Sequence, residues 1–320
     1  MITPSIDLRE PEGLRITAEG LYRLGEAAYH ADPAPEPSLS SSLARVLLDH
    51  TPLHCWTAHP QLNPAWAPEE RGARVAMGSA CHALLLGHGA AVRVVEADSW
   101  RTKAAQIERD AALAAGELPL LAAQHEQAQR IVEAAQKQLW RAGLDVVTDP
   151  DAGACEVSAF ARHESGAWLR ARFDWFAADR RIIVDYKTTE DAGAETFARR
   201  VAQMGYDVQA AFYLRVLALL DRESEGRTHF LFLAQETAPP YALAAYELGA
   251  GDLEVARRKV ETAIELWARC RQTGVWPAYP ATIQRLTLPH WHEQRWLERE
   301  LGGDEQNDPA WQLAGDRGAA

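Results

Sequence analysis

The fold of this chain depends on two segments joined by a short polar turn: Arg172-Phe173-Asp174-Trp175-Phe176 and Ile182-Ile183-Val184-Asp185-Tyr186-Lys187-Thr188-Thr189. Their aromatic and β-branched residues predict two neighbouring strands. Side chains alternate between the two faces of a strand, so Asp185 and Lys187 should point the same way, and Asp174 should reach them from the adjacent strand. Buried charges must be paired or bind a metal. The cluster is therefore a candidate site for a hard divalent cation and a phosphate, with a surface salt-bridge cluster as the alternative.

The rest of the chain predicts a sheet with helices around it. Period-two patterns give strands at 155–160, 168–176, 181–187, 228–234 and 242–248, and apolar periodicity gives helices at about 194–220, interrupted near Gly205, and 252–271. This order predicts an α/β or α+β fold with a central mixed sheet flanked by helices.

The N-terminal part predicts a helical extension. We expect one helix from about Ala18 to Tyr29, a second capped by the serines at 40–42, and a third starting near Val75 and ending at Gly87. Residues 91–96 are a possible strand, and 103–142 are predicted to be mostly helical, with a break near Gly116 and Pro119. We divide the chain into an N-terminal segment (1–74), a core (75–275) with a helical insertion (97–150), and a Trp-rich tail (276–320).

Composition limits the function. The chain has 320 residues and is 47% hydrophobic, so it can bury a core. Its formal net charge of −12 argues against non-specific nucleic-acid binding through overall charge. A local basic groove or a metal-bridged phosphate remains compatible with this charge. The four cysteines lack a C-x-x-C pair, and no signal pattern or membrane-spanning run occurs. We expect a cytoplasmic protein without a membrane partner.

Three separated motifs carry a resemblance to a known family. The string Asp174…Asp185-Tyr186-Lys187 resembles the motif of PD-(D/E)xK nucleases, with Phe173 where that superfamily usually has proline. Gln209-x-x-x-Tyr213 resembles the Q-x-x-x-Y motif of RecB-type nucleases, and Gly78-x-x-x-His82 resembles the G-x-x-x-H helix of the same group. The segments 38–42 and 274–279 look like the exodeoxyribonuclease VIII (RecE-like) branch found in phages and prophages. The similarity covers most of residues 30–292.

The resemblance implies a restriction-endonuclease-like core and a set of site residues. His82, Asp174, Asp185 and Lys187 would be catalytic. Asp174, Asp185 and the backbone carbonyl of Tyr186 would hold Mg²⁺ or Mn²⁺. His82 would add a metal ligand or a phosphate contact, and Lys187 would position the attacking water. Hard cations on carboxylates supply what phosphodiester hydrolysis needs, namely hydroxide and charge neutralisation.

Further polar residues near these motifs have two interpretations each. Glu156 could be an extra metal ligand or a solvated carboxylate. Gln209 and Tyr213 lie one helical turn apart and, with Tyr206 in the same string, could contact DNA or support the core. Five arginines could form a local phosphate-binding surface or ordinary solvated charge: Arg170, Arg172, Arg199, Arg200 and Arg215.

By resemblance, the activity would be 5′→3′ digestion of double-stranded DNA ends, leaving a 3′ single strand for an annealing protein of the RecT type, and the chain could be a homo-oligomer. A structure-specific or restriction-type endonuclease on the same core is one alternative. A catalytically inactive nucleic-acid-binding or scaffold protein is the other. Residues 97–150 could form an arm over DNA or pack on the sheet.

Overall fold

The computed structural model describes residues 6–11, 13, 15–67 and 73–302, with side chains of 73–76 and 301–302 excepted. The chain divides into two units, Met1–Ala278 and Tyr279–Ala320. The first unit contains every sheet in the described part of the chain. In the second, the described residues include one helix, α10 (His290–Gly302), and all of those with described burial are exposed. None of the described helices is both long and apolar enough to cross a membrane.

A seven-stranded mixed sheet forms the centre of the first unit. Its strand order is β1-β5-β6-β7-β8-β9, and β2 pairs in parallel with the start of β6. The strands are β1 (Gly20–Arg23), β2 (Ser38–Ser40), β5 (Gly153–Arg162), β6 (Trp168–Ala177), β7 (Ile182–Thr189), β8 (His229–Glu236) and β9 (Leu243–Tyr246). β5, β6 and β7 form an antiparallel meander, whereas β7 and β8 run parallel. The mixed sheet and the three-strand meander predicted from the sequence are confirmed.

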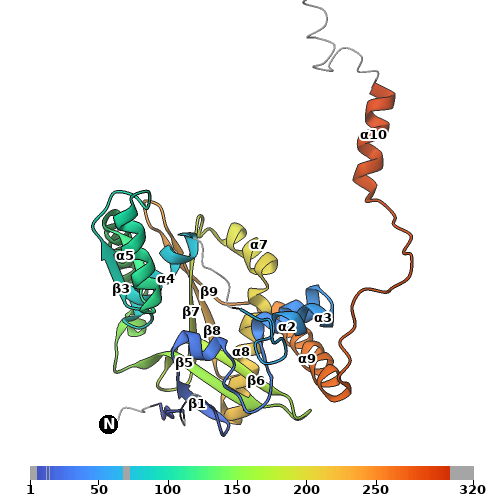
Figure 1. Ribbon diagram of the computed structural model, residues 1–320, viewed down its shortest axis with the longest axis horizontal. Coiled ribbons are helices and arrows are strands. Elements are labelled where there is room, and N and C mark those ends of the chain that lie inside the picture. Colours follow the sequence, from blue (N-terminus) through green and yellow to red (C-terminus); the bar gives the residue numbers. More distant parts are fainter. Residues whose placement is uncertain (1–5, 12, 14, 68–72, 303–320) are drawn as a thin grey trace, which may run out of the picture. The chain divides into compact units, whose positions relative to one another are not determined.

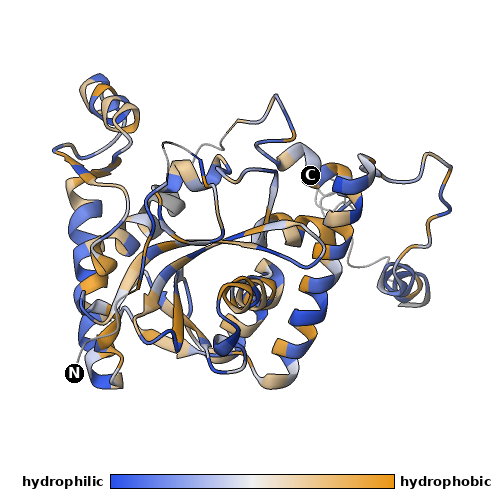
Figure 2. Cartoon of the chain, turned by 90° about the horizontal axis from the view of Figure 1, so that it is seen from below, coloured by the Kyte–Doolittle hydropathy of each residue, from blue (hydrophilic) through white to orange (hydrophobic). Residues whose placement is uncertain are grey.

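Helices cover both faces of this sheet. One face packs against α2 (Ser41–Asp49), α8 (Tyr206–Leu220) and α9 (Ala250–Thr273), with α3 (Pro52–Ala58) and α7 (Ala194–Met204) beside them. The other face packs against α4 (Ala73–Leu86) and α6 (Ala122–Ala142). Figure 1 shows the strands between these two groups of helices. Figure 2 shows hydrophobic residues along the sheet and on the helices that flank it.

Local signals explain several of the element ends. Ser40 caps α2, its hydroxyl accepting a hydrogen bond from Leu43 N. The break predicted near Gly205 is confirmed, because this glycine has φ +67° and separates α7 from α8. Short 3₁₀ turns at Asp145–Thr148 and Arg222–Ser224 complete the connections.

The predicted helix from Ala18 to Tyr29 is wrong. Residues 20–23 form β1, and only Glu26–His30 is helical, as α1. β1 pairs with β5, which places Leu21 in the main core and Tyr22 in a smaller N-terminal cluster with Phe160. Burial of alternate side chains on two faces therefore outweighs local helical preference.

Within residues 97–150, α6 packs on the central sheet, whereas the segment before it packs on a separate two-stranded sheet. α5 (Lys103–Ala114) and α6 confirm the predicted helices, but the break between them forms β4 (Leu118–Leu121), which pairs in parallel with β3 (Val92–Val95). Gln138 of α6 donates a hydrogen bond to Tyr241 O and accepts one from Leu243 N beside β9. These bonds tie α6 to the sheet.

Candidate active site

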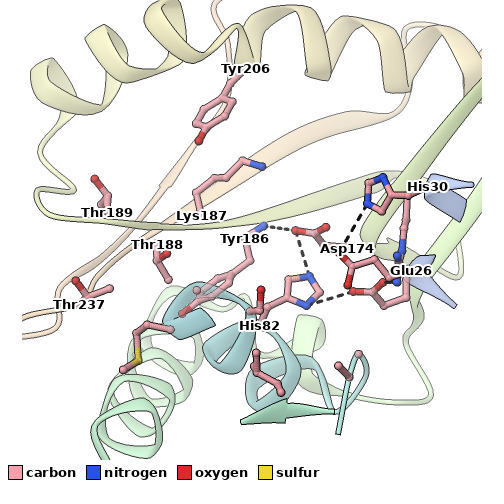
Figure 3. A pocket seen from close by; sticks show the side chains of 18 of the residues that line it. Glu26, His30, His82, Asp174, Tyr186, Lys187, Thr188, Thr189, Tyr206 and Thr237 are labelled. Carbon is pink, nitrogen blue, oxygen red and sulfur yellow. Dashed lines mark hydrogen bonds and ion pairs between the residues drawn. The ribbon is translucent and has the colours of Figure 1, made fainter. Parts of the chain in front are cut away.

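The site begins where β6 and β7 separate. These strands pair at only two positions, Trp175↔Val184 and Phe176↔Ile183. Next to this short ladder, the Asp174 carboxylate accepts a hydrogen bond of 2.8 Å from the backbone N–H of Tyr186. A side chain thus takes the place of a backbone partner, and Asp174 lies in the fork between the two strands (Figure 3).

Asp185 and Lys187 lie on the same face of β7, toward α8. Lys187 Nζ is 2.7 Å from Asp185 Oδ2, and Gln209 Nε2 of α8 donates a 2.7 Å hydrogen bond to Asp185 Oδ1. Asp185 is only 1% exposed, and its Oδ2 has no well-aligned hydrogen bond with any described residue. The ammonium of Lys187 also lies 4.7 Å from the ring centre of Tyr206. The Asp185–Lys187 pair is therefore held by Gln209 at the carboxylate and by the Tyr206 ring at the ammonium.

His82 approaches the fork from α4, on the other side of the sheet. Its Nε2 lies 3.4 Å from Asp174 Oδ2, and its Nδ1 lies 3.2 Å from Glu156 Oε1. Glu156 in turn forms an ion pair with Arg172. Asp174 and Glu156 occupy facing positions on β6 and β5, given the register Cys155↔Trp175 and Val157↔Phe173. The imidazole is held between the two carboxylates.

A glycine allows α4 to come this close. Gly78 lies one turn before His82, and a Cβ at position 78 would be 2.9 Å from Thr188 Oγ1 of β7. Such a distance is too short for two non-bonded atoms, so a side chain at position 78 would require Thr188 to rotate or the helix to shift. Gly78 thus permits the close approach of the His82 helix to the Asp185-x-Lys187 strand.

The ionisation of the site follows from burial and from close opposite charges. Burial raises the pKa of Asp185 to about 6, against the lowering effect of Lys187 and with a further increase from Asp174. Burial acts to lower the pKa of Lys187, but the carboxylates of Asp185 and Asp174 outweigh it, and the pKa rises.

Asp174 and His82 shift in opposite directions. Burial acts to raise the pKa of Asp174, but the charge of His82 and its hydrogen bond dominate and lower it. Burial acts to lower the pKa of His82, but Asp174 dominates and raises it. The two shifts agree with each other and favour an imidazolium–carboxylate pair.

These side chains border a cleft of about 820 Å³. Eight of the ten residues assigned to the site from the sequence line it: His82, Glu156, Arg172, Asp174, Tyr186, Lys187, Tyr206 and Tyr213. Asp185 and Gln209 lie beneath, and the Tyr213 hydroxyl is hydrogen-bonded to Gln209. Three interacting segments far apart in sequence therefore supply one site.

The structure separates the five arginines that the sequence grouped together. Arg172 and Arg200 line the cleft. Arg170 is buried in an ion pair with Asp32, Arg199 pairs with Glu195 on the surface, and Arg215 pairs with Glu164 and Glu261. The proposed common phosphate-binding surface is thus reduced to two members.

Sequence reasoning missed the part of the cleft that α1 contributes. Glu26, Tyr29 and His30 line it, although they belong to a segment predicted as one long helix. Thr189 and Thr237 line it as well, at the ends of β7 and β8. No motif marks these residues, because only the pairing of β1 with β5 and of β7 with β8 brings them to the site.

The donors at the fork suit a hard cation. Asp174 and Asp185 supply carboxylate oxygens, which Mg²⁺ and Mn²⁺ prefer, and Asp185 is 1% exposed. In the described ranges, no group of three or more His, Cys, Asp and Glu is already arranged to hold a metal. The carboxylates are instead engaged by His82 and Lys187.

This combination of a forked mixed sheet, helices on both faces and an Asp…Asp-x-Lys pair at the fork defines the PD-(D/E)xK class of nuclease folds. The chain belongs to the family described as PDDEXK-like domain of unknown function (DUF3799), whose model matches residues 51–288. The resemblance to PD-(D/E)xK nucleases, stated from three motifs, is therefore confirmed.

One solved structure shares the fold. A candidate exonuclease from Eubacterium rectale is 16% identical, with a TM-score of 0.54 over 83% of this chain and 96% of that one. A phage-related exonuclease from Haemophilus somnus is 11% identical, with a TM-score of 0.27 over 63% of this chain and 84% of that one. No curated protein is significantly similar in sequence.

Proposed function

We propose that this chain is a metal-dependent deoxyribonuclease that hydrolyses phosphodiester bonds. The observation that carries this proposal is the meeting of Asp174 with Asp185 and Lys187 at the strand fork, on one side of a cleft. Buried carboxylates beside a lysine are costly to a fold unless they are paired or serve a site. The membership in a PDDEXK-like family supports the same proposal.

Asp174 and Asp185, with the backbone carbonyl of Tyr186, would hold Mg²⁺ or Mn²⁺. Such an ion supplies a hydroxide nucleophile near neutral pH and neutralises charge that develops on the phosphate. Gln209 orients Asp185 through its 2.7 Å hydrogen bond. This second contact fixes the carboxylate before any ion binds.

Lys187 and His82 act beside the carboxylates, one from each face of the sheet. Lys187 donates an N–H hydrogen bond to the attacking water or to a phosphate oxygen, and its pairing with Asp185 keeps it charged. His82 contacts the phosphate or joins the metal ligands, as the resemblance implies. Glu156 is shared between His82 and Arg172, which supports a role in holding those two groups in place.

The finer activity that we propose is 5′→3′ exonuclease action on double-stranded DNA ends, with 5′-phosphate products, within phage-type recombination. Its support is the exodeoxyribonuclease VIII resemblance of the segments 38–42 and 274–279, and the fold shared with a candidate exonuclease. A single-strand annealing protein of the RecT type and a homo-oligomer belong to this proposal. Endonuclease and inactive scaffold are the competing functions.

A cleavage assay separates the three. Linear duplex and covalently closed circular DNA would be incubated with the chain in Mg²⁺, in Mn²⁺ and in EDTA. We expect degradation of the linear DNA alone, no activity in EDTA, and loss of activity in Asp185→Ala. Asp110→Ala, which removes an exposed surface carboxylate, is the control.

Each alternative has its own outcome. Cleavage of closed circles supports the endonuclease instead of the exonuclease. Equal activity of Asp185→Ala and the wild-type chain rejects the assigned site. Binding of DNA without cleavage in either metal supports the scaffold. End-labelled substrates then give the polarity.

A further inference from the structure

The positive charges that line the cleft are nearly all matched by carboxylates. His82 lies between Asp174 and Glu156, and Arg172 pairs with Glu156. Lys187 pairs with Asp185, and His30 lies 3.7 Å from Glu26. These groups are therefore largely neutralised before a polyanionic substrate arrives.

Arg200 of α7 is different. It lines the same cleft, yet its side chain forms no ion pair and no hydrogen bond with any residue in the described ranges. Its Nε is buried without an acceptor. Arg200 as a whole is only half-buried, and its two Nη atoms are not among the buried ones, so an acceptor from outside the chain can reach the charged end of the side chain.

Helix α7 does carry a carboxylate, because the adjacent Arg199 has one as its partner. Arg199 is exposed and pairs with Glu195 one turn earlier, at 2.8 Å. Arg200 has its side chain turned toward the cleft instead. The two adjacent arginines thus differ in environment while sharing charge, helix and sequence context.

The position of α7 places this cation beyond the strand fork. The helix follows β7 after a short loop, and Thr188 and Thr189 at the end of β7 line the cleft with Arg200. In Figure 3, Thr189 and Thr237 lie on one side of Lys187 and Asp174, whereas Glu26 and His30 lie on the other. The Thr189 hydroxyl at this end of the cleft already donates a hydrogen bond to Asp191 O, so it is not a free donor for a ligand.

We infer that Arg200 forms an anion subsite that binds a phosphodiester group of the substrate strand next to the bond that is cut. A guanidinium binds phosphate oxygens through paired, charge-assisted hydrogen bonds. The subsite holds the strand across the fork, so Arg200 is a substrate-binding residue and not a metal ligand. This inference rests on the proposed nuclease function.

Binding measurements on the full chain test the subsite. A fluorescein-labelled DNA duplex would be titrated with wild type, Arg200→Ala, Arg200→Gln, Arg200→Lys and Arg199→Ala, with Ca²⁺ in place of Mg²⁺, at several salt concentrations. Loss of a charge-assisted hydrogen bond predicts a Kd increase of roughly tenfold for Arg200→Ala and Arg200→Gln. We expect Arg200→Lys to keep part of the affinity, because it keeps the charge but not the paired geometry.

The salt dependence distinguishes a phosphate contact from a structural role. Removing one phosphate contact lowers the slope of log K against log salt by about 1. Arg200→Ala and Arg200→Gln should show this decrease, and Arg199→Ala should keep the wild-type slope and a Kd within about twofold. Thermal unfolding of each variant shows whether it is folded.

Two outcomes overturn the inference. The first is an Arg200→Gln variant that is folded and binds DNA with the affinity and slope of Arg199→Ala. The second is the same decrease for both arginines, which indicates only overall charge. If the wild type binds DNA through Arg200 but cuts none in Mg²⁺, the nuclease proposal fails while the subsite stands. Inorganic phosphate as competitor shows whether a free anion occupies it.

Discussion

At the scale of single residues, Gln209 links the helix side of the sheet to the buried carboxylate. Its amide donates to Asp185 Oδ1 at 2.7 Å, and Tyr213 is hydrogen-bonded to Gln209 in turn. We predict that Gln209→Ala lowers the rate of DNA cleavage by roughly 10- to 100-fold, since loss of a residue that orients a metal ligand has effects of this size. Steady-state cleavage in Mg²⁺ measures it.

A matched control is available on α7. Gln203 is exposed, and its described hydrogen bond uses only its backbone oxygen, so Gln203→Ala should leave the rate unchanged. We also expect Gln209→Ala to require more Mg²⁺ for half-maximal activity, because a freely rotating Asp185 is a weaker ligand. Equal Mg²⁺ dependence in the two variants contradicts the orienting role.

Asp32 is a second buried carboxylate, outside the cleft. It accepts hydrogen bonds from Ser38 N and Ser38 Oγ at 2.8 and 2.6 Å, and lies 3.2 Å from Arg170 and 3.3 Å from His59. We predict that Asp32→Asn lowers the free energy of unfolding by about 3–5 kcal/mol, because it leaves Arg170 buried without its counter-charge. Urea unfolding measures this, with the exposed Asp49→Asn as control, for which a change below about 1 kcal/mol is expected.

The same carboxylate predicts an acid-labile part of the stability. Burial acts to raise the pKa of Asp32, but Arg170, His59 and Ser38 outweigh it and lower the pKa below 3.8. The stabilisation is therefore complete above that value and is lost as the pH falls through the lower pKa of the folded state. We expect the difference between wild type and Asp32→Asn to shrink below about pH 4. An equal difference at pH 3 and pH 7 rejects this assignment.

At the scale of elements, the contact of α4 with β7 decides whether His82 reaches Asp174. We predict that Gly78→Ala lowers the cleavage rate by roughly 100-fold, since a shift of about 1 Å in a catalytic group has effects of this order. Its effect on stability should be small, because alanine favours the helix by about 1 kcal/mol and so offsets part of the clash with Thr188.

Substitution of Thr188 tests whether a clash with its hydroxyl causes the expected loss of rate in Gly78→Ala. Thr188→Ala removes the Oγ1 atom that the new Cβ would meet, so Gly78→Ala/Thr188→Ala should recover part of the rate lost in Gly78→Ala. A double variant that is no faster than the single variant shows that Gly78 acts in another way. Thermal unfolding of both variants separates catalytic loss from unfolding.

The elements also show what local patterns can and cannot predict. The meander of β5, β6 and β7 was predicted because alternation and turn residues are local properties of the sequence. The strands β1 and β4 were predicted as helix or helix break, since each is short and becomes a strand only through pairing with β5 or β3. Short segments with a weak local preference depend on their tertiary partners.

At the scale of the whole molecule, the chain has one unit that contains the candidate active site and a second unit after Ala278. Trp276 belongs to the first: its ring contacts that of the fully buried Trp267 at 5.3 Å, and Pro277 O accepts a hydrogen bond from Leu53 N. These contacts connect the last residues of this unit to α9 and α3.

We predict that a chain ending at Ala278 keeps the melting temperature of the full chain, within about 2 °C. A chain ending at Gly274 loses the packing of Trp276, and we expect it to be less stable by about 1–3 kcal/mol. Calorimetry of the three chains checks this. A large decrease already in the chain ending at Ala278 shows that residues 279–320 stabilise the first unit.

The sheet meander and the flanking helices follow from the sequence and are confirmed, and the sequence also predicts the residues of the candidate site. Asp174, Asp185 and Lys187 can be recognised in the sequence because charges among apolar strand residues are rare and costly. Tertiary structure alone decided how these groups are paired. The fork between β6 and β7 turns Asp174 toward Tyr186 N and His82, and leaves Arg200 as a cleft-lining cation without a described partner, while Arg199 beside it is neutralised. Ionic pairing depends on a few ångströms between segments distant in sequence, and no local pattern encodes such distances.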